Sequence, residues 1–122
     1  MSRSIRIRVA AVVLFLGIAL GAFGAHGLEG RLEETGRLDN WETATLYHLL
    51  HGLALFVVAT TAPRALGYYW FLGGIVLFSG SLYALALSDF ATLGAVTPLG
   101  GVSFLVGWGR WIFSSKGSLA VS

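Results

Sequence analysis

Residues 9–28 read VAAVVLFLGIALGAFGAHGL, a run that contains no Asp, Glu, Lys or Arg. Three more runs without these residues follow, at 43–63, 65–88 and 90–109. The hydrocarbon core of a bilayer is about 30 Å thick, and a helix needs about 20 mostly apolar residues to cross it. Each run is long enough for one crossing. Together they fill most of the 122-residue chain and predict four membrane-spanning segments.

The four segments are expected to be helices. Inside lipid, every backbone N–H and C=O must find a partner within the protein, and a helix provides these partners by itself. Strands of a membrane barrel alternate polar and apolar residues, whereas these runs do not alternate. We therefore expect an all-α integral membrane four-helix bundle that forms one domain over residues 1–122. The expected spans are 7–27, 42–62, 67–87 and 91–113, with a polar loop at 28–41.

The composition supports a membrane protein and excludes several other classes. Apolar residues make up 56% of the chain and charged residues 11%, against about 25% charged residues in a soluble domain. The absence of cysteine excludes disulfides, thiolate metal sites, iron–sulfur clusters and cysteine nucleophiles. A net charge of +2 is too small for a nucleic-acid-binding surface, so we expect no nucleic-acid partner.

The basic residues indicate the orientation in the membrane. Six of the eight Lys and Arg residues lie in the two terminal regions and in the link between the second and third spans. Because cytoplasmic loops carry an excess of Lys and Arg, these three regions are expected on the cytoplasmic side. Both the N-terminus and the C-terminus are therefore expected to be cytoplasmic.

A secretory signal peptide is the alternative interpretation of the first span. The basic start MSRSIRIR precedes an apolar run, and small residues at 22–25 resemble a cleavage site. The apolar region of a signal peptide has about 7–15 residues, whereas this apolar run is longer. We expect the segment to be retained as a span.

Polar side chains inside the spans are the candidate functional residues. Thr43, Tyr47, His48 and His51 fall within about 140° of one another on a helix and share one face. Hydroxyl groups in the third span lie at the depth of these histidines and can hydrogen-bond to them. The candidate intramembrane polar cluster consists of His26, Thr43, Tyr47, His48, His51, Ser79, Ser81 and Tyr83. Ionisable residues at such depth are commonly functional, and the alternative is a neutral histidine that only bonds a neighbouring helix.

Glycines in the first span predict close helix packing. Gly17 and Gly21 are four residues apart, so they stack on one face, and Gly24 follows near it. Small residues on one face allow another backbone to approach closely. Packing within the bundle is the expected role, and a self-dimer contact is the alternative.

Two regions are expected to lack a regular membrane helix. Pro98, followed by Gly100 and Gly101, predicts a break in the fourth span, because proline removes a helical N–H and clashes with the preceding turn. The polar loop 28–41 is expected to be a solvated connection, and a short helix on the membrane surface is the alternative.

The sequence contains none of the common catalytic motifs. There is no phosphate-binding loop, dinucleotide fingerprint, HExxH motif or nucleophile elbow. The acidic residues lie near the expected interfaces, so paired buried carboxylates are not expected. Helix rise places His26 and His51 about 13 Å apart along the membrane normal, which disfavours a shared metal or haem. We expect no catalytic residue, no metal and no cofactor.

Four motifs resemble one known family. They are Gly21-Ala22-Phe23-Gly24-Ala25-His26-Gly27-Leu28, Trp41-x-Thr43-Ala44-x-x-Tyr47-His48-x-x-His51, Phe78-Ser79-Gly80-Ser81-Leu82-Tyr83 and Thr97-Pro98-x-Gly100-Gly101. Together they resemble an uncharacterised bacterial inner-membrane family, domain of unknown function 423 (YgdD-like), with mitochondrial relatives called transmembrane protein 256. The resemblance covers about residues 7–112. It implies a four-span, multi-pass protein of the bacterial inner (plasma) membrane and supplies no activity.

These observations lead to three function hypotheses. The expected role is a non-catalytic accessory, assembly or interaction subunit of a larger membrane complex. One alternative is a small transporter or channel that acts as an oligomer, with the broken fourth span and the histidines lining a path. Another is a redox subunit that binds haem or quinone. The expected partners are the lipid bilayer and either a larger membrane complex or further copies of the chain.

Overall fold

The computed structural model describes residues 1–62 and 64–114. These residues form helices and contain no strand, which confirms the all-α class. Four helical segments are long and apolar enough to cross a membrane: Arg3–Ala25, Leu38–Thr61, Tyr68–Ser88 and Ala91–Ile112. The four-helix membrane bundle is thus confirmed. Lys116, which belongs to the expected cytoplasmic tail, lies outside the described residues.

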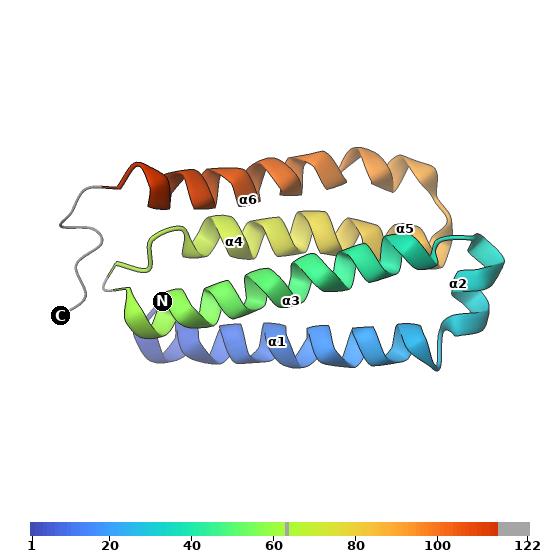
Figure 1. Cartoon of the computed structure of the whole chain (residues 1–122), viewed down its shortest axis with the longest axis horizontal. Coiled ribbons are helices and arrows are strands. Elements are labelled where there is room, and N and C mark those ends of the chain that lie inside the picture. The colour runs from blue at the N-terminus through green and yellow to red at the C-terminus, as the bar shows by residue number, and fades with distance from the viewer. Residues whose placement is uncertain (63, 115–122) are drawn as a thin grey trace.

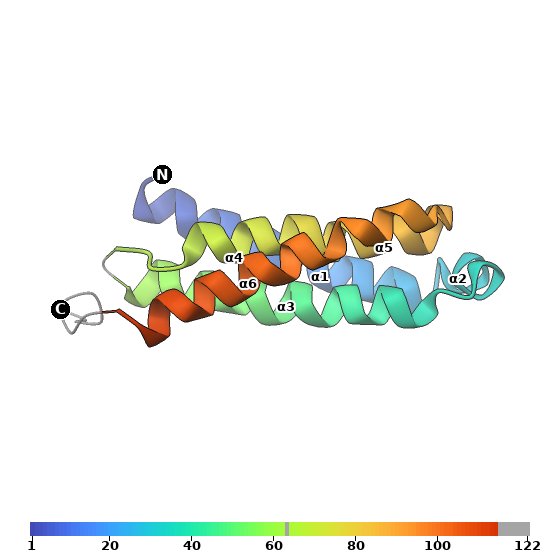
Figure 2. The ribbon, with the colours of Figure 1, turned by 90° about the horizontal axis from the view of Figure 1, so that it is seen from above.

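The spans lie side by side and run antiparallel to their neighbours in the sequence (Figures 1 and 2). α1 (Arg3–Ala25) packs against α3 (Leu38–Thr61), and α3 packs in turn against the third span. The third span comprises α4 (Tyr68–Gly74), η1 (Ile75–Ser79) and α5 (Gly80–Ser88). The fourth comprises η2 (Ala91–Ala95) and α6 (Thr97–Ile112), and it packs on the third.

Charged residues divide the bundle into two ends. The start of α1, the link from α3 to α4 and the end of α6 lie at the same end, and α2 (Glu29–Thr35) lies at the other (Figure 1). The first end, which we call the arginine end, carries Arg3, Arg6, Arg8, Arg64 and Arg110. The opposite, acidic end carries all six acidic residues of the chain, Glu29, Glu33, Glu34, Asp39, Glu42 and Asp89.

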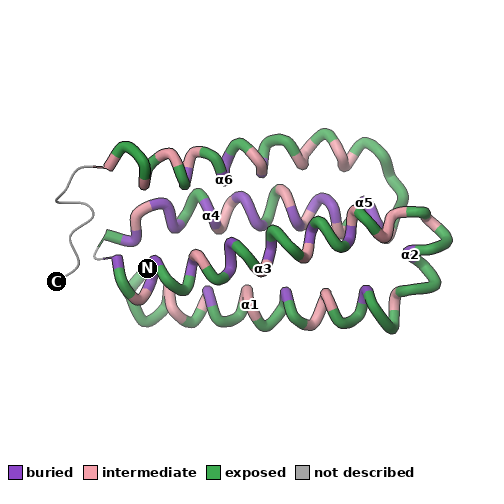
Figure 3. The backbone as a smooth tube through the Cα atoms, viewed as in Figure 1, coloured by how far each residue is buried: buried purple, intermediate pink, exposed green. Residues whose placement is uncertain are grey.

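The inner helices are the more buried ones (Figure 3). In the most apolar window of each span, 50% of the residues of the third span and 39% of those of α3 are buried, against 17% for α1 and 22% for the fourth span. The main core lies toward the arginine end, where Ala10, Leu55, Tyr68, Phe71 and Phe104 pack together. The outer faces of α1 and α6 are apolar, as a lipid-facing surface requires.

The connection at 28–41 differs from the expected solvated loop, because it contains α2 and the first turn of α3. Leu32 of α2 is fully buried against Trp41 and Ala86, which gives this short helix a packed side. Gly36 ends α2 in the left-handed conformation, with φ of 70°, which glycine adopts without a steric penalty. The apolar side of α2 therefore rests on α3 and α5.

Hydrogen bonds also fasten α2 and its exit to the end of α5. The hydroxyl of Thr35 donates to the carbonyl oxygen of Ala86 at 2.9 Å, and Arg31 Nε donates to that of Leu87 at 2.9 Å. Arg37 pairs with Asp89 at 2.7 Å. These links join the first connection of the chain to the third.

The third and fourth spans depart from regular α-helix where they face each other. η1 is a π-helical segment, and η2 is a 3₁₀-helical segment that precedes α6. Pro98 lies in the first turn of α6, where a proline costs little because the first N–H groups of a helix have no intrahelical partner. Gly100 packs against the backbone of Phe78, and Gly101 lies beside the Phe78 ring. The irregular segment of the fourth span thus precedes Pro98, and the glycines after it belong to the helix–helix contact.

Candidate functional site

His48 is buried and uses both ring nitrogens for bonds to other helices. Its side chain is 5% exposed. Nε2 lies 2.8 Å from the carbonyl oxygen of Val13, and Nδ1 lies 2.9 Å from the hydroxyl of Tyr83. A carbonyl only accepts, so Nε2 carries the hydrogen, and Nδ1 of the neutral ring accepts from the hydroxyl. His48 therefore joins α3 to α1 and to α5.

His51, one turn further along α3, has the opposite arrangement of hydrogens. It is 3% exposed, and its Nδ1 donates to the carbonyl oxygen of Tyr47 at 3.0 Å. Its Nε2 accepts from the indole N–H of Trp108 at 3.0 Å. The ring also stacks on Phe104, with centroids 3.7 Å apart. His51 therefore joins α3 to α6.

The two histidines together connect α3 to each of the other three spans. They are three residues apart, so they lie on the same side of α3 but point to different neighbours. A neutral imidazole offers one donor and one acceptor, and in both rings these two are engaged within the chain. The arrangement suits neutral histidines that hold helices in register.

A second set of polar contacts continues from His48 toward the acidic end. The Tyr83 hydroxyl lies 3.3 Å from the hydroxyl of Thr45, which donates to the carbonyl oxygen of Trp41 at 3.0 Å. The indole N–H of Trp41 donates to the carbonyl oxygen of Leu20 at 2.9 Å. Tyr83 and Trp41 also pack ring on ring, with centroids 4.6 Å apart. These contacts extend the polar core along the α1–α3 interface.

The structure brings together part of the predicted polar cluster. Tyr83 reaches a histidine, whereas Ser79 donates to the carbonyl oxygen of Ala44 at 2.8 Å and Ser81 bonds the hydroxyl of Thr97 at 2.6 Å. These two serines join the third span to α3 and to the start of α6. They do not contact either histidine ring through a hydrogen bond.

The remaining predicted members lie at the edge of this core or outside it. Tyr47 is 37% exposed, and its ring packs on Phe78 with centroids 4.7 Å apart. Thr43 is exposed on α3, and His26 is exposed at the C-terminal cap of α1. His26 is therefore not part of the site that His48 and His51 form.

Three residues of the polar core were not predicted as members. Thr45 and Trp41 lie three and seven residues before His48, so helical spacing alone would place them near its side of α3. The third is Trp108 of α6, whose indole N–H donates to His51 Nε2. No sequence signal pairs these two residues, because 57 positions separate them.

The predicted glycines of α1 face α3. A Cβ on Gly17 would lie 2.6 Å from Leu49 Cδ2 and 3.3 Å from His48 Cδ2, and one on Gly21 would lie 3.0 Å from Thr45 Cγ2. A Cβ on Gly24 would overlap the indole of Trp41. This face is covered by α3, so the structure uses it for packing within the bundle.

The chemistry of the polar core does not fit a haem or metal site. An axial haem bond or a metal bond needs an imidazole nitrogen with a free lone pair. The two acceptor nitrogens, Nδ1 of His48 and Nε2 of His51, are already engaged by Tyr83 and Trp108. Among residues 1–62 and 64–114, no three His, Asp or Glu side chains gather closely enough to hold a metal ion.

Comparisons with a family profile and with individual known proteins both find membrane proteins of unknown function. The profile of the family described as protein of unknown function (DUF423) matches residues 20–101. The UPF0382 membrane protein YwdK of Bacillus subtilis (strain 168) is 47% identical over 105 residues, which cover 80% of this chain and 85% of its own. The UPF0382 membrane protein SERP0230 of Staphylococcus epidermidis is 48% identical over 103 residues, which cover 80% and 84%. No solved structure matches the chain.

Proposed function

The chain belongs to the DUF423 family of unknown function, and on this premise we propose that it is a non-catalytic accessory, assembly or interaction subunit of a larger membrane complex. It is a multi-pass membrane protein. We further propose that it lies in the bacterial inner (plasma) membrane with both termini in the cytoplasm. The five arginines at the end where α1 begins and α6 ends support this orientation.

The closed polar core is the observation that carries this proposal. Catalysis and ligand binding need groups that can exchange partners with a substrate, such as a free base or an open acceptor. Here the polar side chains deep in the bundle use their bonds on neighbouring helices, as His48, His51 and Ser79 illustrate. Such a core fixes the geometry of a small bundle, and this supports a structural role as an accessory subunit over a catalytic role.

The outer surface supports an interaction role. α1 and the fourth span are the least buried spans, so most of each helix is free to contact lipid or another protein. Large apolar side chains such as Phe15, Leu105 and Ile112 are more than two-thirds exposed. In a membrane, helices associate through close packing rather than through the hydrophobic effect. Exposed helices of this kind can therefore pack against a partner without leaving the lipid phase.

Extraction of the complex tests the proposal. A tag at the C-terminus, gentle detergent or polymer nanodiscs, and quantitative mass spectrometry would identify proteins that accompany the chain in fixed proportion. An unrelated four-span protein with the same tag and expression level serves as the control. We expect a stoichiometric membrane partner that the control lacks. A stable monomer recovered without any such partner would refute the accessory role.

A transporter or channel that acts as an oligomer is the second candidate. The third and fourth spans each contain an irregular segment: η1 packs against α6, and η2 packs against α5. Discontinuous helices are a feature of transport sites. Proton flux into liposomes that contain the purified protein and a pH-sensitive dye would test this candidate. Flux equal to that of empty liposomes would argue against a proton path.

A further inference from the structure

The arginine side chains at the arginine end differ in whether they have hydrogen-bond partners within the protein. Arg3 donates to the carbonyl oxygen of Thr60 at 2.9 Å, and Arg6 donates to that of Met1 at 2.6 Å. The two pairs of opposite charge within the described residues, Arg31–Glu34 and Arg37–Asp89, lie at the acidic end. Arg64 and Arg110 have no hydrogen-bond or ion-pair partner within the part of the chain that the structure describes.

Arg64 and Arg110 line one hollow of about 400 Å³. Its other walls are the turn Ala65–Gly67 and the first residues of α4, with Tyr69 and Trp70. The turn is held in place because Trp111 donates from its indole N–H to the carbonyl oxygen of Leu66 at 2.8 Å. The hollow is therefore a fixed cationic recess between the start of α4 and the end of α6.

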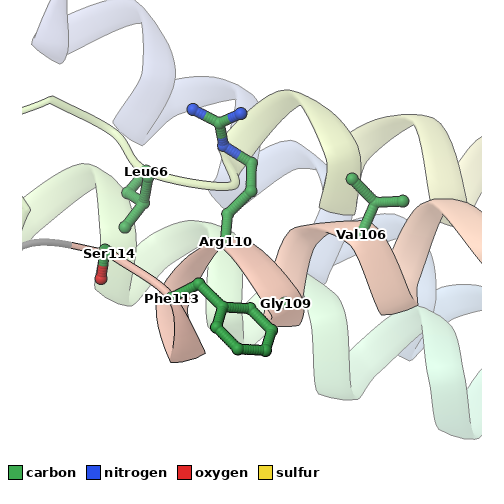
Figure 4. A pocket seen from close by; sticks show the side chains of 6 residues that line it. All are labelled: Leu66, Val106, Gly109, Arg110, Phe113 and Ser114. Atoms are coloured by element: carbon green, nitrogen blue, oxygen red, sulfur yellow. The ribbon is translucent and has the colours of Figure 1, made fainter.

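A second hollow, of about 530 Å³, lies beside the first and shares Leu66 and Arg110 with it. Its apolar walls are Val106 and Phe113 on the side of α6 and Leu66 on the link before α4 (Figure 4). In the same view the Arg110 side chain extends away from α6, and Phe113 points to the other side of the helix (Figure 4). A cationic recess thus adjoins an apolar surface at the membrane boundary that Tyr69 and Trp70 mark.

We propose that Arg64 and Arg110 bind the phosphate group of an anionic phospholipid in the hollow between α4 and α6, with an acyl chain along Val106, which lies one turn of α6 deeper in the membrane than Arg110. The guanidinium group is planar and binds phosphate oxygens through two parallel hydrogen bonds. Basic pockets between membrane helices on the cytoplasmic side bind anionic lipid headgroups. The adjoining apolar wall favours a lipid over a free phosphate ion. This site is independent of the proposed accessory role, but it rests on the proposed orientation, which places the arginine end on the cytoplasmic side.

Native mass spectrometry of the purified protein tests this site with phosphatidylglycerol as the probe. Arg64→Gln and Arg110→Gln remove one charge each from the hollow, and Arg8→Gln removes one from the same end, on α1, outside both hollows. We expect about tenfold weaker phosphatidylglycerol binding for each hollow variant, because each loses charge-assisted hydrogen bonds to the phosphate. Arg8→Gln should bind like the unaltered protein. Arg110→Lys keeps the charge but loses the planar guanidinium group, so its affinity for phosphatidylglycerol should lie between those of the unaltered protein and Arg110→Gln.

Three results would overturn the site. Equal weakening by Arg8→Gln would show a general attraction of the cationic end for anionic lipid. Binding of phosphatidylcholine as strong as that of phosphatidylglycerol would show that the site does not recognise the negative charge of the headgroup. Displacement of the lipid by millimolar inorganic phosphate would assign the hollow to a free anion. Circular dichroism and gel filtration of every variant would establish that each remains folded, and Arg110→Lys provides the comparison if Arg110→Gln does not.

Discussion

Replacing Tyr83 by phenylalanine removes one hydroxyl from the polar core and leaves the aromatic ring in place. That hydroxyl donates to His48 Nδ1 at 2.9 Å and lies 3.3 Å from the Thr45 hydroxyl. The ring contacts with Trp41 should persist, because they involve carbon atoms that the variant retains. The variant therefore measures what the bond between α5 and α3 contributes to stability.

The expected loss is about 1 kcal/mol in the free energy of unfolding. Hydrogen bonds between membrane helices contribute about 0.6 kcal/mol on average and up to about 1.7 kcal/mol, because the unfolded chain in the membrane also finds partners. The Tyr83 bond should lie in the upper part of this range, since its loss leaves Nδ1 of a histidine that is 5% exposed without a donor.

Tyr47→Phe is the matched control. It deletes the same atom from a tyrosine whose hydroxyl makes no hydrogen bond within the described residues and whose side chain is 37% exposed. Unfolding in mixed micelles of increasing SDS content, followed by circular dichroism, gives the two free energies. A double-mutant cycle of Tyr83→Phe with His48→Ala isolates the pair. The reasoning is refuted if Tyr83→Phe costs no more than Tyr47→Phe, or if the cycle yields no coupling energy.

The remaining predictions concern the packing face of α1 and the orientation of the bundle. Gly24→Ala should lower the free energy of unfolding by about 1–3 kcal/mol, because the added Cβ overlaps the fixed indole of Trp41. Gly30→Ala, whose added Cβ would have nothing within 4 Å, should be neutral or slightly stabilising. Equal effects of the two substitutions in the SDS titration would contradict this packing. Because the chain has no cysteine, Ser2→Cys and Glu33→Cys give single labelling sites at opposite ends. An impermeant maleimide should label intact spheroplasts at position 33 only, and the reverse pattern would invert the proposed orientation.

Much of the fold could be predicted from where charges are absent. A lipid core tolerates so few charged residues that four uncharged runs define four spans, without knowledge of which helix contacts which. The histidine side of α3 could also be predicted, since His48 and His51 are both buried on it. The sequence offered a short helix in this connection only as the alternative to a loop, because the stability of α2 depends on Leu32 packing against Trp41 and Ala86, which the sequence does not show.

The membership of the polar core could be predicted only in part, because the arc that holds Thr43, Tyr47 and the histidines is wider than the buried side of the helix. The buried positions of α3 include Trp41, Ala44, His48 and Leu55, which follow one another at intervals of three, four and seven residues. Thr43 precedes Ala44 by one residue and so lies about 100° away from that side. The partners of the hydroxyl groups depend on how the helices cross, which the composition of one helix does not determine.

The two hydrogen-bond partners of each histidine are synthesised at different times. Val13 is made before His48, and Tyr47 before His51, so each ring has one partner as soon as α1 and α3 are in the membrane. The other partner of His51, Trp108, is 57 residues away. At synthesis rates of about 5–20 residues per second, Trp108 is made roughly 3–11 s after His51. His51 therefore has only one of its two partners while the third and fourth spans are being made, and the last helix completes the bundle by supplying the missing indole N–H.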